Sequence, residues 1–174
     1  MIRTRLQEIT QNCDLLLHHE LIELEHDKTQ HSIEVLTSPN DNLRYNCVMF
    51  ALGIETDPKY MAMAKHCPDD VHADTKFLQF LVDRGYLVES AHKNGVLIAY
   101  LDSGQFRHIG IVTDGNRVRS KWGIGHLYEH VLFEIPVSYG STLRFFEPIE
   151  RQVVLDAFVE FAELRGCHFG NSEI

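Results

Sequence analysis

The strand-forming segments of this chain are gathered into one stretch, residues 86–146, and helical patterns lie before and after it. Turn sequences at Lys93-Asn94-Gly95 and Asp114-Gly115-Asn116 predict hairpins within this stretch. Because strands of a parallel sheet alternate with helices along a chain, the grouping predicts an α+β fold with an antiparallel sheet. The β-rich runs cover residues 86–89, 96–100, 108–113, 117–122 and 143–146.

Four segments outside this stretch have helical patterns. Apolar residues recur at helical spacing in the longer ones, and the shortest is an apolar run that predicts a buried helix. Gly53, Gly85 and Gly166 follow three of them and are typical of helix ends. The four segments are residues 3–25, 45–53, 73–84 and 148–165.

The remaining segments predict a strand, a turn and a connection. Ile33 and Val35 alternate with polar neighbours, which predicts a short strand. Residues 38–42 are dense in turn-forming side chains. Residues 54–72 are expected to form an irregular, acidic connection. No stretch resembles a linker between domains, and the length of 174 residues favours a single domain, 1–174.

The charge balance excludes some classes of protein. The chain has 25 acidic and 16 basic residues and a formal net charge of −9, so we expect neither nucleic acid nor a membrane surface as a partner. It lacks a run of about 18 apolar residues and an apolar signal core near its start. A cytoplasmic location is therefore expected, although a specialised secretion system would leave no such mark.

Cys47 is the first candidate for chemistry. It lies at the predicted start of the helix in residues 45–53, where unpaired backbone N–H groups stabilise a thiolate and can bind an oxyanion. The alternative is a small buried apolar residue, which is the commoner role of a free cysteine. None of the four cysteines has CxxC spacing, so a zinc ribbon is not expected and all four should be reduced thiols.

His108 is the candidate base. It begins the strand sequence His-Ile-Gly-Ile-Val, where a neutral imidazole can take a proton from a thiol on a helix packed across the sheet. The alternative is a half-exposed strand histidine, since the chain has 11 histidines. Asn46, just before Cys47, is expected to cap the helix or to hold the preceding loop.

Two weaker clusters could bind a metal ion, and we expect neither to do so. His18, His19, Glu23 and His26 form pairs at helical spacing without a third ligand, and His66, Cys67 and His72 lie in the acidic connection. The sequence also lacks the glycine-rich motifs of nucleotide-binding loops. No metal or other cofactor is therefore expected.

The order of these features resembles the NlpC-type cysteine hydrolases, which have a circularly permuted papain-like fold. The resemblance is closer to a poorly characterised set of bacterial domains in that superfamily, and it covers residues 38–147. It implies a Cys-headed helix packed on an antiparallel sheet, with an additional N-terminal helix and strand in residues 1–37 and a C-terminal helix in 148–174. The residues that carry it are Tyr45-Asn46-Cys47, Phe50-Ala51, Gly53, His108, Ser120-Lys121-Trp122-Gly123, His130 and Tyr139-Gly140.

The resemblance implies roles for Cys47 as nucleophile and His108 as base. A third residue on the next strand orients the base, and Ser120 occupies that position where the family has His, Asn, Asp or Gln. Glu129 and His130 are alternatives for this role, and each could equally lie on a solvated strand. Cofactors play no part in this chemistry.

Two interpretations are open for Tyr45 and for Trp122, which lie near the implied site in the sequence. Tyr45 could donate a hydrogen bond to an oxyanion, as a tyrosine near the nucleophile does in some members of the superfamily, or it could be a packing residue. Trp122 could line a substrate groove or belong to the core. Lys121 alternates with Trp122 and is expected to be exposed.

The implied function is a cysteine-dependent hydrolase (peptidase, amidase or deamidase) that acts on an amide bond of a peptide or protein. An injected bacterial effector or toxin would fit this function. Two alternatives stay open. Ser120 departs from the family pattern, which would suit a catalytically inactive binding module of the same fold. The same Cys and His would also serve a cysteine-dependent acyltransferase.

Overall fold

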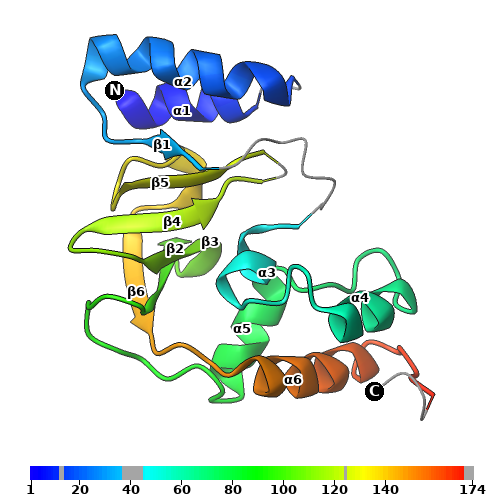
Figure 1. Cartoon of the computed structure of the whole chain (residues 1–174). Helices are drawn as coiled ribbons and strands as arrows, with labels where there is room; N and C mark the ends of the chain where they lie inside the picture. The colour runs from blue at the N-terminus through cyan, green and yellow to red at the C-terminus, as the bar shows by residue number, and fades with distance from the viewer. Residues whose placement is uncertain (12–13, 37–44, 124, 171–174) are drawn as a thin grey trace.

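A computed structural model describes residues 1–11, 14–36, 45–123 and 125–170. The described part forms one six-stranded antiparallel sheet with the strand order β1-β5-β4-β3-β2-β6, together with helices, so the predicted α+β class is confirmed (Figure 1). The strands are β1 (Glu34–Val35), β2 (Leu97–Asp102), β3 (Gln105–Val112), β4 (Arg117–Lys121), β5 (Leu127–Val131) and β6 (Thr142–Phe146). The helices are α1 (Ile2–Thr10), α2 (Leu15–Thr29), α3 (Cys47–Ala51), α4 (Pro58–Lys65), α5 (Thr75–Asp83), α6 (Arg151–Glu163) and the 3-10 turn η1 (Val137–Tyr139).

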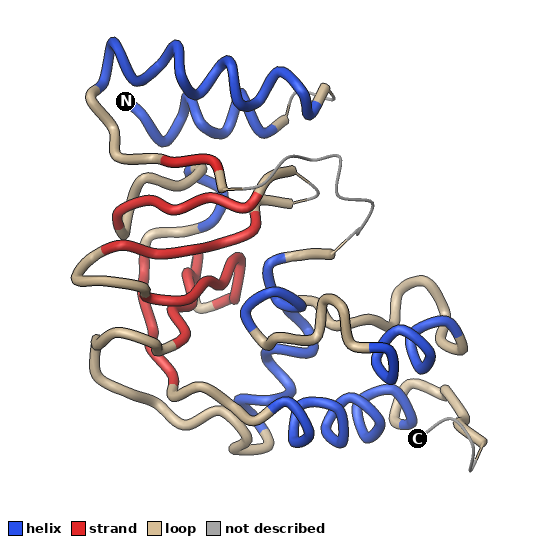
Figure 2. Tube along the Cα trace, viewed as in Figure 1, coloured by secondary structure: helices blue, strands red, loops and turns tan. Residues whose placement is uncertain are grey.

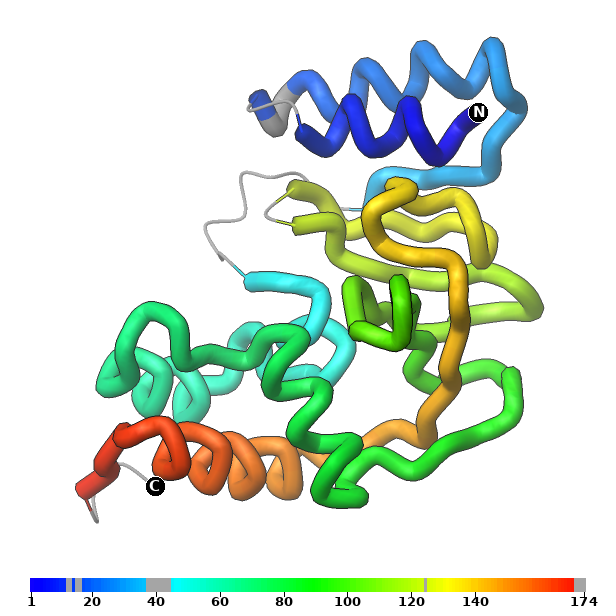
Figure 3. Tube along the Cα trace, turned by 180° about the vertical axis from the view of Figure 1, so that it is seen from behind, coloured from blue at the N-terminus to red at the C-terminus, as the bar shows by residue number. Residues whose placement is uncertain are grey.

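Helices cover the sheet in two separate groups. Helices α1 and α2 lie side by side beyond β1, and α3 to α6 form a second group on the other side of the molecule (Figures 1 and 3). Figure 2 shows the strands between the two groups. Each group has its own buried cluster, the first around Leu6, Ile22 and Tyr128 and the second around Phe77, Ile109 and Phe158. A buried strand such as β3 therefore contributes alternate side chains to different cores.

Three short helices of the second group begin at side-chain caps. Asn46, Asp57 and Asp74 each accept hydrogen bonds from two backbone N–H groups in the first turn of the helix that follows. The caps of α3 and α5 confirm two predicted helices. The helix α4 corrects the expectation that residues 54–72 are irregular, because Asp57 and Pro58 form a standard helix start.

The N-terminal segment also differs from expectation. Two helices, α1 and α2, replace the single helix predicted over residues 3–25, and α2 continues to Thr29. Leu6 and Ile9 on α1 pack in the same core as Ile22 on α2, so the two helices bury their apolar residues together. Cys13 and the turn predicted at residues 38–42 lie outside the described residues.

Three predictions about the strands were incomplete or wrong. Residues 86–89 form only an isolated bridge between Glu89 and Phe146, because the chain runs past the sheet edge there. The Lys93–Gly95 turn leads into β2 and does not join two strands. The hairpin turn between β2 and β3 lies instead at Ser103 and Gly104, both with positive φ. The strand β5 was missed because Leu127–Val131 does not alternate between apolar and polar residues.

None of the described helices combines the length and the apolar character needed to cross a bilayer.

Candidate active site

Cys47 is the first residue of α3, and Asn46 fixes the position of this helix. The Asn46 side-chain oxygen accepts hydrogen bonds from the N–H groups of Val48 and Met49, at 2.9 and 3.0 Å. Its amide nitrogen donates to the carbonyl oxygen of Ala73 at 2.8 Å, which joins the start of α3 to the segment before α5. The predicted capping role of Asn46 is confirmed, and Cys47 lies partly exposed at the end of an anchored helix.

The thiol of Cys47 meets the sheet where strands β3 and β4 separate. The paired residues of these strands end at Ile111 and Arg119. The N–H of Ile109 is the next on the same edge of β3, and it donates a hydrogen bond to the Cys47 thiol. Because Ile109 directly follows His108, this contact places the thiol beside the strand position that carries the histidine.

His108 lies buried in β3 between two tyrosines. Its ring is stacked on the ring of Tyr139, with 4.0 Å between centroids and 12° between planes. Tyr100, its neighbour across the strand pair, lies 5.8 Å away. Within the described part of the chain, the Nε2 atom of His108 is buried without a hydrogen-bond partner. Burial keeps the pKa of His108 well below its usual value, and repulsion from His130 when that ring is protonated in acid lowers it further.

Tyr139 covers the candidate base. Burial raises the pKa of its phenol, the charge of a Cys47 thiolate raises that pKa further, and the Tyr139 ring is stacked on His108. Its hydroxyl oxygen accepts a hydrogen bond from the N–H of Gly123. Sequence analysis assigned no role to this residue, although Tyr139-Gly140 belongs to the motif set of the resemblance.

Ser120, His130 and Trp122 form a buried hydrogen-bonded chain beside His108. The Nδ1 atom of His130 donates to the carbonyl oxygen of Val131 at 2.9 Å. Burial lowers the pKa of His130 to about 4, so the ring is neutral and its Nε2 is an acceptor. The Ser120 hydroxyl therefore donates to that Nε2 at 2.9 Å and accepts from the Trp122 indole N–H at 3.0 Å. Both hydrogen bonds join Ser120 to residues other than His108. The role of Ser120 in orienting His108 therefore stays a prediction.

The burial of these side chains corrects one interpretation from the sequence and supports another. Ser120 and His130 are fully buried, so neither lies on a solvated strand. Trp122 is also buried and stacks on Tyr128 at 4.1 Å between centroids, as expected of a core residue. Glu129 points to the other face of β5, where it pairs with Arg117 at 2.8 Å.

Gly110 makes room for this arrangement. A Cβ atom added to it would lie 2.9 Å from the Cβ of Ser120 and 2.8 Å from both the Val118 side chain and the Arg119 carbonyl oxygen. A glycine at this position of the His-Ile-Gly-Ile-Val strand therefore lets β4 approach β3 beside the histidine.

Lys121 and Tyr45 meet at the rim of the site. Lys121 is buried, which corrects the expectation of an exposed side chain. Its ammonium group donates to the Gly125 carbonyl oxygen and lies 4.8 Å from the centre of the Tyr45 ring. Burial lowers the pKa of Lys121 to about 8. Tyr45 itself is half-buried and precedes Asn46, so it borders the start of α3.

The electrostatic state of Cys47 differs from the expected thiolate. Burial raises the pKa of its thiol to about 11, and this effect outweighs the backbone N–H groups of Ile109, Cys47 and Val48, which lower it. With the pKa of His108 depressed, the resting pair is a neutral thiol and a neutral imidazole. A preformed thiolate–imidazolium pair is therefore not expected at rest.

Among the residues that the structure describes, no group of three or more His, Cys, Asp or Glu side chains is placed to hold a metal ion. The thiols of Cys67 and Cys167 are hydrogen-bonded to each other.

Comparison with known proteins gives one match. A family model described as "Domain of unknown function (DUF7689)" matches residues 35–147, roughly two thirds of the chain. No curated protein and no solved structure gives a significant match. The matched range contains helices α3 to α5 and strands β2 to β6, and the helices α1, α2 and α6 lie outside it.

Proposed function

The chain belongs to the DUF7689 family, and we propose that it is a cysteine-dependent hydrolase that cleaves an amide bond in a peptide or protein. Cys47 is the nucleophile and His108 its base. The observation that carries the proposal is the hydrogen bond from the Ile109 N–H to the Cys47 thiol, because it brings the thiol to the strand position next to His108. The proposed fold is of the papain-like NlpC type, supported by a Cys-headed helix against an antiparallel sheet.

The proposed reaction has two steps. His108 takes the thiol proton as the Cys47 sulfur attacks the carbonyl carbon, and a C–S bond forms. The oxyanion collapses, the C–N bond breaks, and His108 protonates the departing amine, which leaves a thioester. A water molecule, deprotonated by His108, then attacks the thioester, the C–S bond breaks, and the acid is released with the thiol restored.

Residues around the pair supply orientation and charge stabilisation in this proposal. The backbone N–H of Cys47 and the hydroxyl of Tyr45 are assigned to the oxyanion. Tyr139 holds the imidazole plane from one side. Ser120 keeps one free lone pair after its bonds to His130 and Trp122, so the third position is assigned to this buried pair of Ser120 and His130.

A chromogenic ester tests the proposal without knowledge of the substrate. Incubation with p-nitrophenyl acetate should release p-nitrophenolate and place an acetyl group on Cys47, detected by intact mass and peptide mapping. Cys47→Ala should abolish the adduct, and His108→Ala should slow acetylation and deacetylation at least tenfold. Cys67→Ala is the matched control and should behave as the parent chain. Full reactivity of either Cys47→Ala or His108→Ala would refute the assignment.

Two observations favour a second candidate, a binding module without catalysis. The raised pKa of Cys47 and the unpartnered Nε2 of His108, within the described residues, would also suit two inert buried groups. In that case Cys47 would stay unmodified by the ester while the fold remains intact. The same experiment therefore separates the two functions.

A further inference from the structure

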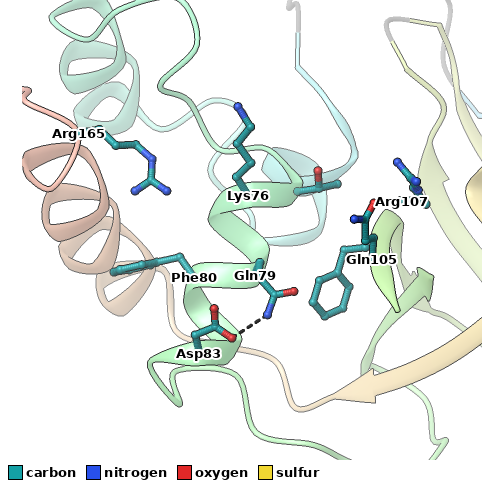
Figure 4. A pocket seen from close by; sticks show the side chains of 9 residues that line it. Lys76, Gln79, Phe80, Asp83, Gln105, Arg107 and Arg165 are labelled. Atoms are coloured by element: carbon teal, nitrogen blue, oxygen red, sulfur yellow. Dashed lines mark hydrogen bonds between the residues drawn. The ribbon is translucent and has the colours of Figure 1, made fainter. Parts of the chain in front are cut away.

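A groove of about 650 Å³ runs along one side of α5, and its volume lies within the range of about 300–1,000 Å³ that is typical of ligand pockets. Figure 4 shows the groove between α5, the strand β3 and the end of α6. The aromatic residues Phe80 and Phe106 form its apolar part, and Lys76, Arg107 and Arg165 bring positive charge to it.

One end of the groove adjoins the candidate active site. Arg107 directly precedes His108 on β3. Lys76 lies in the first turn of α5, and the segment before that helix is joined to the start of α3 by the hydrogen bond from Asn46 to the Ala73 carbonyl oxygen. Lys76 and Arg107 therefore belong to segments that adjoin the elements carrying Cys47 and His108.

The charge of the groove is opposite to the charge of the whole chain. Three cations and one carboxylate line it, whereas the chain has a formal net charge of −9. The carboxylate, Asp83, lies toward the end of α5 and accepts a hydrogen bond from Gln79 at 2.7 Å. Asp83 is thus separated along α5 from Lys76, which lies in the first turn of the helix.

The three cations keep bonding capacity for a ligand. Lys76 makes no ion pair within the described part of the chain. Among the described residues, the ion pair of Arg107 is a long contact of 3.8 Å with Asp102. Arg165 lies 3.6 Å above the Phe161 ring and donates through one nitrogen to the Phe161 carbonyl oxygen, so packing fixes its guanidinium while its other N–H groups stay available.

We propose that this groove binds a peptide segment of the substrate that carries aspartate or glutamate side chains close to the scissile amide bond. Carboxylates pair with Lys76, Arg107 and Arg165, and Phe80 and Phe106 contact the aliphatic parts of the segment. The position of the scissile bond in this inference rests on the proposed function. The acidic character of the ligand rests on the groove alone.

Peptide binding tests the acidic preference without catalysis. A rhodamine-labelled hexapeptide of alternating glutamate and alanine is titrated against the full chain with Cys47→Ala, and fluorescence anisotropy is compared with that of an alternating lysine and alanine hexapeptide at low ionic strength. We expect at least tenfold tighter binding of the acidic peptide. Because the chain is acidic overall, non-specific attraction would favour the basic peptide instead. A basic preference, or none, would overturn the inference.

Charge reversal locates the binding. Lys76→Glu with Arg107→Glu should remove the acidic preference. Lys59→Glu with Lys65→Glu makes the same change in net charge on α4, outside the groove, and should retain the preference. Equal effects of the two double variants would show that the groove does not bind the peptide.

A competition experiment separates this inference from the proposed function. The acidic hexapeptide should slow acetylation of Cys47 by p-nitrophenyl acetate in the unmodified chain, and the basic one should not. If Cys47 is acetylated while the acidic peptide neither binds nor competes, the groove assignment fails and the hydrolase stands. If the acidic peptide binds through Lys76 and Arg107 but Cys47 never reacts, the hydrolase fails and the groove remains an acidic-peptide site.

Discussion

The ring of Tyr139 lies flat on the imidazole of His108, with 4.0 Å between ring centres and 12° between planes. This stack joins the turn η1 to the central strand β3, and it excludes water from one side of the histidine. The following residue, Gly140, has a φ of +98°, and a Cβ there would lie 2.2 Å from the Leu101 carbonyl oxygen. The turn therefore sits tightly against β2, and the position of Tyr139 depends on it.

Replacement of Tyr139 should change the protonation of His108. Tyr139→Leu removes the stacked ring and admits water, so the pKa of His108 should rise toward its usual value, as measured from its NMR titration. Tyr139→Phe keeps the ring and loses only the hydrogen bond from Gly123, which should cost about 1 kcal/mol of unfolding free energy and leave the titration nearly unchanged. Equal titrations of the Leu variant and the parent chain would show that the ring does not desolvate His108.

Helix α1, which lies outside the matched family range, should stabilise the turn that carries Tyr139. The Gln7 side-chain oxygen accepts hydrogen bonds from the N–H of Ser138, at 3.1 Å, and from its hydroxyl. The Arg3 guanidinium donates to the carbonyl oxygens of Ile135 and Gly140. The double variant Arg3→Ala with Gln7→Ala loses these hydrogen bonds. It should show faster amide hydrogen exchange in residues 137–141 and slower acetylation of Cys47.

Glu8→Ala is the matched control on the same helix, because Glu8 pairs with Arg5 at the surface and contacts no residue of the turn among those that the structure describes. It should leave hydrogen exchange in residues 137–141 and Cys47 acetylation as they are in the parent chain. If the double variant behaves like this control, α1 does not stabilise the turn that carries Tyr139.

Acid should destabilise the fold through His130. The pKa of His130 is about 4 in the folded chain and about 6.5 in the unfolded chain. At a pH between these two values, the unfolded chain therefore binds a proton at His130 that the folded chain does not bind. The stability contributed by the neutral ring is present above pH 6.5 and is lost as the pH falls toward 4. At pH 5 the loss is about 2 kcal/mol, measurable by urea unfolding at pH 7.5 and pH 5.

Two variants distinguish titration from packing in that experiment. His130→Gln removes the titrating group, so the difference in unfolding free energy between the two pH values should shrink. Ser120→Ala removes the same hydrogen bond but retains the imidazole, so it should lower stability at both pH values and keep most of the difference. An unchanged difference in His130→Gln would assign the acid sensitivity to other groups.

Alkylation of Cys47 by iodoacetamide should accelerate steadily with pH. Its thiol pKa of about 11 means that the thiolate fraction rises about tenfold for each pH unit between pH 7 and 9. An ordinary thiol, with a pKa near 8.5, approaches its plateau in this range. Peptide mapping assigns the rate to Cys47, and Cys47→Ala supplies the background. A plateau already at pH 7 would indicate a preformed thiolate and contradict the neutral pair.

Local signals predicted much of the framework around the candidate site. Sequence analysis correctly predicted the cap at Asn46, the helix start at Cys47 and the hairpin turn at Asp114–Asn116. These features were predictable because side-chain caps and turn residues act within four positions of the chain. The start of α4 carried an equally local signal in Asp57 and Pro58, but its exposed polar residues were taken for a loop.

The chemical setting of the site was not predictable in the same way. Ser120, Lys121 and His130 are polar residues of short strands, and nothing in their spacing distinguishes a buried position from a solvated one. The packing of α1 and α2 on one face of the sheet buries Ser120 and His130, through residues more than 90 positions away in the chain such as Leu6, whereas Lys121 lies on the opposite face against Tyr45.

The sequence by itself determined where α3 starts, where the hairpin between β3 and β4 turns, and which residues, Cys47 and His108, are the candidates for a nucleophile and a base. Only the tertiary structure decided that the Ile109 N–H reaches the thiol, that Tyr139 covers His108, and that the pair is neutral at rest. The reason is that caps and turns are short-range interactions of the backbone, whereas desolvation depends on every group that surrounds a side chain in space.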